Sequence, residues 1–238
     1  MTIAFTKGRY GVRMAASEAD LRACQALRQR CLFSTPAGLD VDPFDGRCSH
    51  VMIAGDAGLV GTFRVMLLPD GAGIDQTYAA QSYDLTRLSG FAAPMLEMGR
   101  FCIDPAAQNA DILRLAWGAL AQIVDANDVA LMFGCSSFEG IDATPYAAAF
   151  AMMAARYQAP VDWAPLVSAP EVVRFQPDEI VGALAQMPPL LRTYLSMGGW
   201  VSDHAVVDRQ MQTLHVFTGL EIARIPPGRA RALRALAG

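Results

Sequence analysis

The chain has 238 residues, of which 53% are hydrophobic and 18% are charged, and its formal net charge is −4 at pH 7. This composition supplies a sizeable core and excludes a chain that is disordered along its length. The negative balance argues against general nucleic-acid binding. We expect one domain over residues 1–238, because a single large domain is comfortable at this length.

The cysteines and the apolar runs indicate where in the cell the protein is expected. The five cysteines are scattered and form no CxxC pair, which is typical of reduced thiols in a cytoplasmic protein. No metal site is expected, because Cys48 and His50 have no second ligand pair nearby. We expect no signal peptide, and the longest apolar run, 147–155, is too short to span a bilayer. Contact with a membrane surface stays open.

The first half of the chain alternates short strand and helix patterns. A strand is predicted over 10–14, and a helix over 17–32 that Ser17 opens with acidic residues in its first turn. A loop follows over 34–47. Two strands are then expected over 51–54 and 59–68, joined by a turn. A further strand is predicted over 95–103.

The second half begins with a clear amphipathic helix over 111–127. A strand over 129–135, helices over 146–157 and 190–197, and a strand over 214–220 follow. The segment 160–189 is the one plausible boundary, but no low-complexity linker marks it. The expected class is mixed α/β with an elaborated C-terminal third.

Three acidic residues gather in the loop after the first helix, namely Asp40, Asp42 and Asp45. One interpretation is a solvated loop capped by aspartates. The other is a binding site for an ammonium group. Two arginines also stand out, Arg28 late in the first predicted helix and Arg64 within an apolar strand. They could clamp a carboxylate or pair with these acids, or could simply pack their stems.

A charged pair, Glu97 and Arg100, interrupts the otherwise apolar strand over 95–103. Alternation places the two side chains on opposite faces. Charges in a central strand are costly unless they are paired or functional. An internal salt bridge and a general base at Glu97 are both open from the pattern alone. A serine nucleophile is disfavoured, because Ser136 and Ser137 lie outside any Gly-x-Ser-x-Gly motif.

Seven segments together resemble the ornithine lipid N-acyltransferases, bacterial enzymes of the GNAT superfamily. They are RYGVRMA (9–15), LRQR (27–30), GLDVDPFDGRCSH (38–50), VGTFRVMLLP (60–69), LEMGRFCIDP (96–105), LMFGCSSFEG (131–140) and PLLRTYLSMGGWVSDHAVVDRQM (189–211). The resemblance covers nearly the whole chain in the same order. It implies a GNAT fold and an enzyme that needs no bound cofactor.

The resemblance also implies a reaction. The family moves a 3-hydroxyacyl group from acyl carrier protein to the α-amine of ornithine, the first step of ornithine lipid synthesis. Related enzymes are thought to use glutamine instead, so another amino acid as acceptor stays open. Catalytic roles fall on Glu97 and Arg100, and substrate binding on Arg28, Asp40, Asp42, Asp45 and Arg64.

A more distant resemblance connects the chain to the acyl-homoserine lactone synthases. The residues in common are Arg28, Asp42, Asp45, Arg64, Glu97 and Arg100. Those synthases carry a tryptophan soon after the first helix, whereas the first tryptophan here is Trp117, and Leu32 stands where they have phenylalanine. Signal synthesis from S-adenosylmethionine is therefore the weaker enzyme hypothesis. A catalytically inactive GNAT-fold binding module is the alternative outside enzymes.

The donor site is expected where two neighbouring GNAT strands splay apart, over 95–103 and 129–135. The residues assigned to the thioester and pantetheine are Phe101, Cys102, Ile103, Cys135 and Ser136. GNAT proteins that use acetyl-CoA hold its pyrophosphate on a glycine-containing loop at a helix N-terminus. The corresponding segment here, 104–111, has no glycine. Acyl carrier protein carries no such pyrophosphate beyond its pantetheine arm, so it is the expected donor.

The end of the chain is basic. After Glu221 come Arg224, Arg229, Arg231 and Arg234, and no acid follows. Acyl carrier proteins are strongly acidic, so this segment is the expected docking patch for the donor. Arginines that favour a helix C-terminus and a patch for anionic lipid headgroups are the alternatives.

Overall fold

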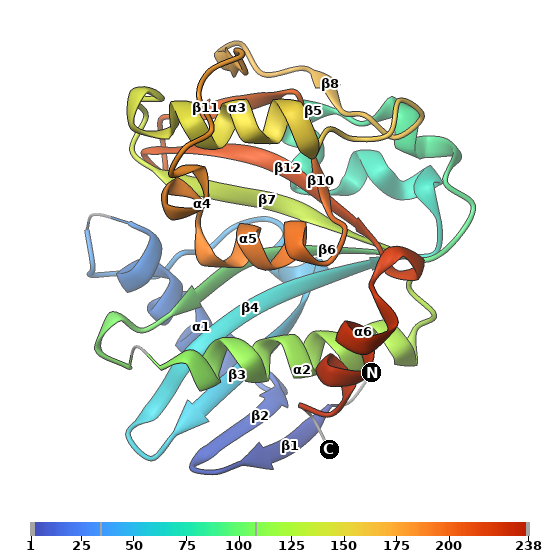
Figure 1. Cartoon of the computed structure of the whole chain (residues 1–238). Helices are drawn as coiled ribbons and strands as arrows, with labels where there is room; N and C mark the ends of the chain where they lie inside the picture. Colours follow the sequence, from blue (N-terminus) through green and yellow to red (C-terminus); the bar gives the residue numbers. More distant parts are fainter. Residues whose placement is uncertain (1–2, 34, 108, 237–238) are drawn as a thin grey trace. The chain divides into compact units, whose positions relative to one another are not determined.

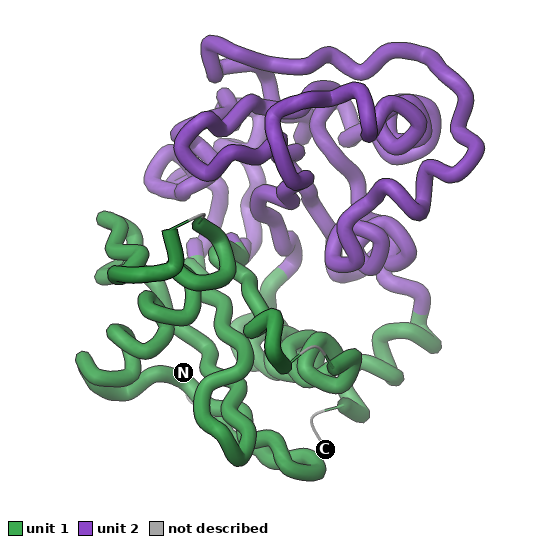
Figure 2. The backbone as a smooth tube through the Cα atoms, turned by 90° about the vertical axis from the view of Figure 1, so that its left-hand side faces the viewer, with its two compact units in different colours: residues 1–67, 98–129, 227–238 green, residues 68–97, 130–226 purple. Residues whose placement is uncertain are grey.

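The computed structural model describes residues 3–33, 35–107 and 109–236. The chain divides into two compact units, each assembled from separate stretches (Figure 2). Unit 1 comprises Met1–Leu67, Met98–Val129 and Pro227–Gly238, and unit 2 comprises Leu68–Glu97 and Ala130–Pro226. The expectation of one domain over residues 1–238 stays a prediction.

Unit 1 is a sheet with helices packed on it. Its strands lie in the order β1-β2-β3-β4-β6, and the successive pairs from β1 to β4 are antiparallel (Figure 1). The strands are β1 (Ala4–Lys7), β2 (Tyr10–Met14), β3 (Ser49–Gly55), β4 (Gly58–Leu68) and β6 (Met95–Ile103). The helices are α1 (Glu18–Leu32), α2 (Ala110–Ala126) and α6 (Pro227–Arg234), with short 3-10 turns η1 (Asp45–Arg47) and η5 (Pro105–Ala107).

Strand β4 separates the two long helices of unit 1. Consecutive strand residues point to opposite faces. A Cβ on Gly61 would lie 3.1 Å from Cγ2 of Ile112 on α2, so a larger residue would press on that helix. The next residue, Thr62, hydrogen-bonds with Cys24 of α1. Helices α1 and α2 therefore cover opposite faces, and the α1 face is the one that carries polar residues.

Unit 2 holds a second set of paired strands. The order is β6-β7-β12-β11-β9, with β6 and β7 parallel and the other pairs antiparallel, and β10 also pairs with β12. These strands are β7 (Leu131–Glu139), β9 (Val172–Arg174), β10 (Trp200–Val201), β11 (His204–Asp208) and β12 (Thr213–Glu221), and β5 (Tyr83–Asp84) pairs separately with β8 (Leu166–Val167). The helices are α3 (Ala147–Arg156), α4 (Ala183–Gln186) and α5 (Pro189–Ser196), with 3-10 turns η2 (Gly71–Gln76), η3 (Ala79–Gln81), η4 (Thr86–Gly90), η6 (Thr144–Tyr146) and η7 (Ile222–Arg224).

Side chains pack against both faces of the β7–β12 pair. One face carries Phe138 and Val216, which pack in a core with helices α3, α4 and α5. On the other face, Phe133 stacks on Phe217 with ring centroids 5.6 Å apart. Tyr83, which is 1% exposed, packs edge-on against Phe217. Unit 2 is thus filled on both faces of its central strands.

Most of the elements predicted from the sequence are confirmed. Strand β6 has the predicted bounds, and Ser17 caps α1 by accepting a hydrogen bond from the amide of Asp20. The predicted end of the strand at Cys135 is wrong, because β7 continues through Ser136 to Glu139 while paired with β12. Sequence patterns missed β1, β5, α4, α6 and the strands β8 to β11. Apart from α6, these are edge strands or elements of five residues or fewer.

Candidate active site

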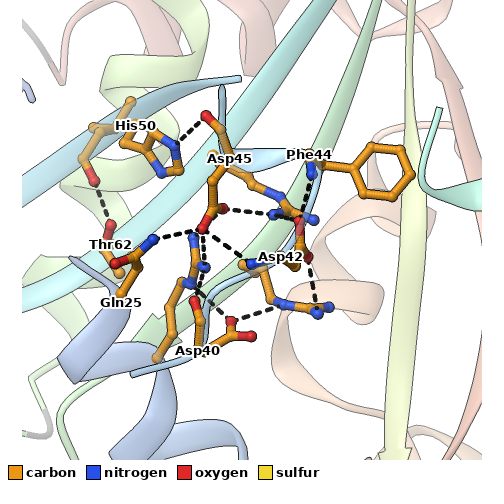
Figure 3. A network of polar contacts seen from close by, with 11 residues as sticks. Gln25, Asp40, Asp42, Phe44, Asp45, His50 and Thr62 are labelled. Atoms are coloured by element: carbon orange, nitrogen blue, oxygen red, sulfur yellow. Dashed lines mark hydrogen bonds and ion pairs between the residues drawn. The ribbon is translucent and has the colours of Figure 1, made fainter. Parts of the chain in front are cut away.

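Six charged side chains of unit 1 form a closed ring in which arginine and aspartate alternate (Figure 3). Each arginine pairs with two aspartates, and each aspartate pairs with two arginines. In order around the ring the members are Arg28, Asp40, Arg100, Asp42, Arg64 and Asp45. The sequence pattern left open whether these arginines and acids pair, and in the structure they do.

Asp40 closes one side of the ring. Its Oδ2 accepts from Nε of Arg28 at 2.8 Å and from Nε of Arg100 at 2.9 Å. Arg28 also donates to the backbone carbonyl of Asp40. Arg100 reaches this position with a backbone φ of 52°, in the left-handed region that costs an ordinary residue roughly 1–2 kcal/mol. The two aspartates bound to Arg100 help to hold that conformation.

The other side of the ring runs through Asp42 and Asp45. Nη1 of Arg64 lies 2.7 Å from Oδ1 of Asp42 and 2.8 Å from Oδ1 of Asp45. Asp42 also shapes its own loop, since its Oδ1 accepts from the amide of Phe44 at 2.8 Å. The loop after α1 is therefore ordered by its acids, which point inward. Leu39 and Val41 alternate with them and are exposed.

The ring is buried to different depths around its circumference. The side chains of Arg28, Asp40, Asp45 and Arg64 are 1–5% exposed, whereas those of Arg100 and Asp42 are 10% and 12% exposed. Buried charges are tolerated only when they are paired. Three positive and three negative groups meet this condition. Arg100 and Asp42 form the more accessible edge.

Burial alone would raise the pKa of Asp45, but hydrogen bonds from Arg28 and Gln25 outweigh it and hold that pKa well below its usual value. The pKa of Asp42 is lowered in the same way, with burial opposed by the hydrogen bond from Arg64. Both carboxylates are therefore charged at neutral pH. A proton acceptor for catalysis is not expected among groups held so firmly in the ionised form.

Two further residues, which the sequence analysis did not assign to the site, form hydrogen bonds with the ring. Gln25 donates from Nε2 to Oδ2 of Asp45 at 2.8 Å. His50 donates from Nε2 to the carbonyl of Asp45 at 3.1 Å, and burial lowers its pKa. Gln25 lies one helical turn before Arg28, so the spacing on α1 was an available signal. His50 gave no such signal, because its partner is a backbone atom.

Glu97 belongs to unit 2 and takes no part in the ring's six ion pairs. It is 5% exposed and is paired in the β6–β7 ladder with Phe133. Its Oε1 accepts from the amide of Ala79 at 2.7 Å, and its Oε2 accepts from the amide of Tyr78 at 2.9 Å. The two amides fix the direction in which the carboxylate points.

The residues assigned to the donor fall in both units. In unit 1, Phe101 packs on Phe63, and Cys31 donates from its thiol to the carbonyl of Ile103 at 3.5 Å. Cys102 is 5% exposed. In unit 2, Cys135 pairs with Phe217 across the strands β7 and β12.

Ser136, also assigned to the donor, is buried, and its hydroxyl accepts from that of Thr218 at 3.0 Å.

The turn before α2 is already capped by the chain itself. Oδ1 of Asn109 accepts from the amide of Asp111 at 2.8 Å, and Oδ1 of Asp104 accepts from the amide of Ala106 at 2.9 Å. Gln108 lies outside the described residues. The side chain of Asp111 adds a negative charge in the first turn of α2. The backbone amides of Ala106 and Asp111 therefore already have side-chain acceptors from the chain.

The basic end of the chain is partly neutralised. Arg234 binds Asp125 of α2 through two contacts of 2.7 Å, and Arg224 pairs with Glu221 at 3.0 Å. Arg229 and Arg231 are exposed on α6. Two of the four arginines of the expected docking patch, Arg224 and Arg234, are therefore paired with carboxylates. Within the described ranges no helix is long and apolar enough to cross a bilayer.

Comparison with known proteins agrees with this architecture. Residues 22–118 match the model of the acetyltransferase (GNAT) domain. Among solved structures, an N-acyl amino acid synthase from uncultured soil microbes superposes with a TM-score of 0.51 at 10% identity, covering 91% of this chain and 94% of that chain. The GNAT fold predicted from the sequence is confirmed.

Two curated relatives extend over almost the full length. The L-ornithine Nα-acyltransferase of Brucella abortus (strain 2308) is 30% identical, over 92% of this chain and 87% of the relative. The enzyme of the same name from Rhizobium meliloti (strain 1021) is 30% identical, over 90% of this chain and 80% of the relative. The chain is an acyltransferase and belongs to the L-ornithine Nα-acyltransferase family.

Proposed function

We propose that this enzyme transfers a fatty acyl group, typically 3-hydroxylated, from the thioester of acyl carrier protein to the α-amine of ornithine. This would be the first step of ornithine lipid synthesis. The observation that carries the proposal is the similarity, over most of both chains, to relatives that are named for this acceptor. The charged groups of the site give it chemical support.

The accessible edge of the ring suits an amino acid. Arg100 and Asp42 are its most exposed members and carry opposite charges. We assign the carboxylate of the acceptor to Arg100 and an ammonium group to Asp42, as charge-assisted hydrogen bonds. Arg28, Asp40, Asp45 and Arg64 are buried more deeply. Their role in the proposal is to hold the edge residues in position.

Glu97 is proposed as the general base. An α-ammonium group must lose a proton before its nitrogen can attack a thioester carbonyl. Glu97 accepts that proton, directly or through a water molecule. The amine then forms the new C–N bond, the C–S bond breaks, and the thiol of the carrier leaves with a proton. The amides of Tyr78 and Ala79 orient the carboxylate for this step.

The capped turn before α2 supports the carrier protein as donor. Asn109 and Asp104 already accept hydrogen bonds from amides there, and Asp111 repels an added anion. Coenzyme A would bring a pyrophosphate to such a turn, whereas the pantetheine arm of a carrier protein would not. Arg229 and Arg231 on α6 are exposed cations of the kind that attract an acidic carrier.

The proposal is tested by offering the enzyme acyl carrier protein thioesters with a panel of amino acids and identifying products by mass spectrometry. We expect N-acyl ornithine as the main product. Asp42→Asn should raise the KM for ornithine with a smaller change in kcat. Glutamine as the preferred acceptor would show that the ornithine assignment is wrong. A homoserine lactone, formed only with S-adenosylmethionine, would instead support the signal-synthase alternative.

A further inference from the structure

Two cysteines of unit 1 that the reaction does not use as nucleophiles lie against each other. Cys31, in the last turn of α1, shares a hydrogen bond with the thiol of Cys102 on β6. The thiol of Cys31 also lies 3.5 Å from the carbonyl oxygen of Ile103, the residue that follows Cys102. Cys31 is partly exposed, while Cys102 is 5% exposed. Both thiols are reduced in this structure.

The environment gives the two thiols different reactivity. The hydrogen bond from Cys102 lowers the pKa of Cys31 below its usual value, against the effect of burial. The same contact, together with burial, raises the pKa of Cys102 well above its usual value. The thiolate is the reactive form of cysteine. The accessible member of the pair is therefore the better nucleophile, and the buried member lies beside it.

We propose that Cys31 and Cys102 are a site of covalent modification, a dithiol that a peroxide closes to a disulfide, and that closure slows acyl transfer. Such pairs, with an accessible cysteine next to a resolving one, are the arrangement found in redox-sensing proteins.

The chemistry requires only the two thiols and a peroxide. The Cys31 thiolate attacks one peroxide oxygen, the O–O bond breaks, and Cys31 becomes a sulfenic acid. Cys102 then attacks the sulfur of that sulfenic acid, the S–S bond forms, and water leaves with the proton of Cys102. In total, two thiols are oxidised by two electrons, and hydrogen peroxide is reduced to two molecules of water.

The position of the pair explains why closure should matter for the enzyme. Arg28 lies one turn before Cys31 on α1, and Arg100 lies two residues before Cys102 on β6. Asp40 bridges these two arginines. A disulfide holds its sulfurs only about 2.05 Å apart, so closure draws the end of α1 towards β6. Arg28 on α1 and Arg100 on β6 would then move relative to each other, and with them their contacts with Asp40.

The test begins with the reduced, full-length enzyme. It is treated with hydrogen peroxide, blocked with iodoacetamide, digested and mapped by mass spectrometry without reduction. We expect a peptide pair linked through Cys31 and Cys102, reversed by dithiothreitol. In Cys102→Ser the sulfenic acid should persist on Cys31 and be trapped by dimedone. Cys48→Ser, which alters another partly exposed cysteine, should still form the link.

Activity is compared as the ratio of oxidised to reduced enzyme for each variant. This readout rests on the proposed function, whereas the mapping does not. We expect the wild type to lose activity by about 10- to 100-fold, since small displacements of positioning groups have effects of that size. Cys31→Ser should keep its activity after peroxide. Absence of the Cys31–Cys102 link, equal inactivation of Cys31→Ser, or a full link with unchanged activity would each overturn the proposal.

Discussion

Arg28 binds both carboxylate oxygens of Asp45, with Nη1 donating to Oδ1 at 2.8 Å and Nη2 donating to Oδ2 at 2.9 Å. The planar fork of arginine matches the two oxygens of a carboxylate, which lysine cannot do. The pair joins α1 to the turn η1, where the acidic loop ends. It is as deeply buried as the Arg28–Asp40 pair, with side chains 1% and 5% exposed in both.

Asp45→Asn is expected to destabilise the protein strongly. It leaves Arg28 and Arg64 without their shared carboxylate, and breaking a buried pair in this way costs about 3–5 kcal/mol of unfolding free energy. Urea denaturation followed by circular dichroism measures the change. Asp111→Asn is the control, because the Arg114–Asp111 pair is exposed and should contribute about 0–1 kcal/mol. Similar losses in the two variants would contradict a structural role for the ring.

Glu97→Gln is expected to lower kcat by about 10²- to 10⁴-fold, the usual contribution of a general base. Glutamine has an NH2 group in place of one carboxylate oxygen, and this group cannot accept the hydrogen bond from the amide of Tyr78 or Ala79. Some loss of stability is therefore expected. Unfolding measurements on the variant separate the two effects. A folded Glu97→Gln enzyme with normal kcat and an unchanged pH profile would remove Glu97 from the catalytic role.

His215 should make the protein less stable at mildly acidic pH. Burial lowers its pKa to about 4 in the folded protein, while an unfolded histidine titrates near 6.5. Below about pH 6.5 the unfolded chain binds a proton that the folded chain does not. The unfolding free energy therefore falls as pH drops towards 4, by about 3 kcal/mol in total, and this contribution is constant below that pH.

Urea titrations of the wild type and of His215→Gln between pH 7 and pH 4 isolate the contribution of this histidine to the unfolding free energy. The contributions of all other titrating groups are present in both proteins and cancel in the difference. The unfolding free energy of the wild type, relative to that of His215→Gln, should fall by about 3 kcal/mol as the pH drops from 7 to 4. Tyr83, whose hydroxyl lies 3.2 Å from Nδ1 of His215, is unchanged in the comparison. A difference that is constant with pH would show that His215 titrates normally.

Arg229→Gln combined with Arg231→Gln should lower kcat/KM for the acyl carrier protein thioester by about 3- to 10-fold, an effect that salt should diminish. Arg209→Gln is a matched control, since Arg209 is exposed and pairs with Glu171 in unit 2. The thioester of coenzyme A should be a poorer donor. Equal use of both donors without a salt effect would contradict docking on α6.

The fold could be read from the sequence where patterns were long and regular. Strand β6 and helix α2 have strong periodicity, and their predicted bounds agree with the structure to within one residue. Strand β11 is short, and β8 has only two residues, so neither presents a pattern that distinguishes it from loop. The partner of β8 is β5, which is distant in the chain, and local sequence does not reveal that pairing.

For the candidate site, residue types were predictable but their partnerships were not. Arg64 stood out because a charge is unusual in its apolar strand, and Asp42 because three acids gather in its loop. That each arginine meets two aspartates in a closed ring depends on how α1, β4 and β6 come together. Glu97 illustrates the same limit, since its partners are the backbone amides of Tyr78 and Ala79, which carry no signal in the sequence.

The position of the acyl group in the product tests the proposed reaction most directly. The enzyme is supplied with 3-hydroxyacyl carrier protein and ornithine whose α-nitrogen alone is labelled with ¹⁵N, and the product is fragmented by tandem mass spectrometry. We predict an amide that contains the label, formed at a higher kcat/KM than with glutamine. An amide on the unlabelled side-chain nitrogen, or faster turnover of glutamine, would contradict the proposed reaction.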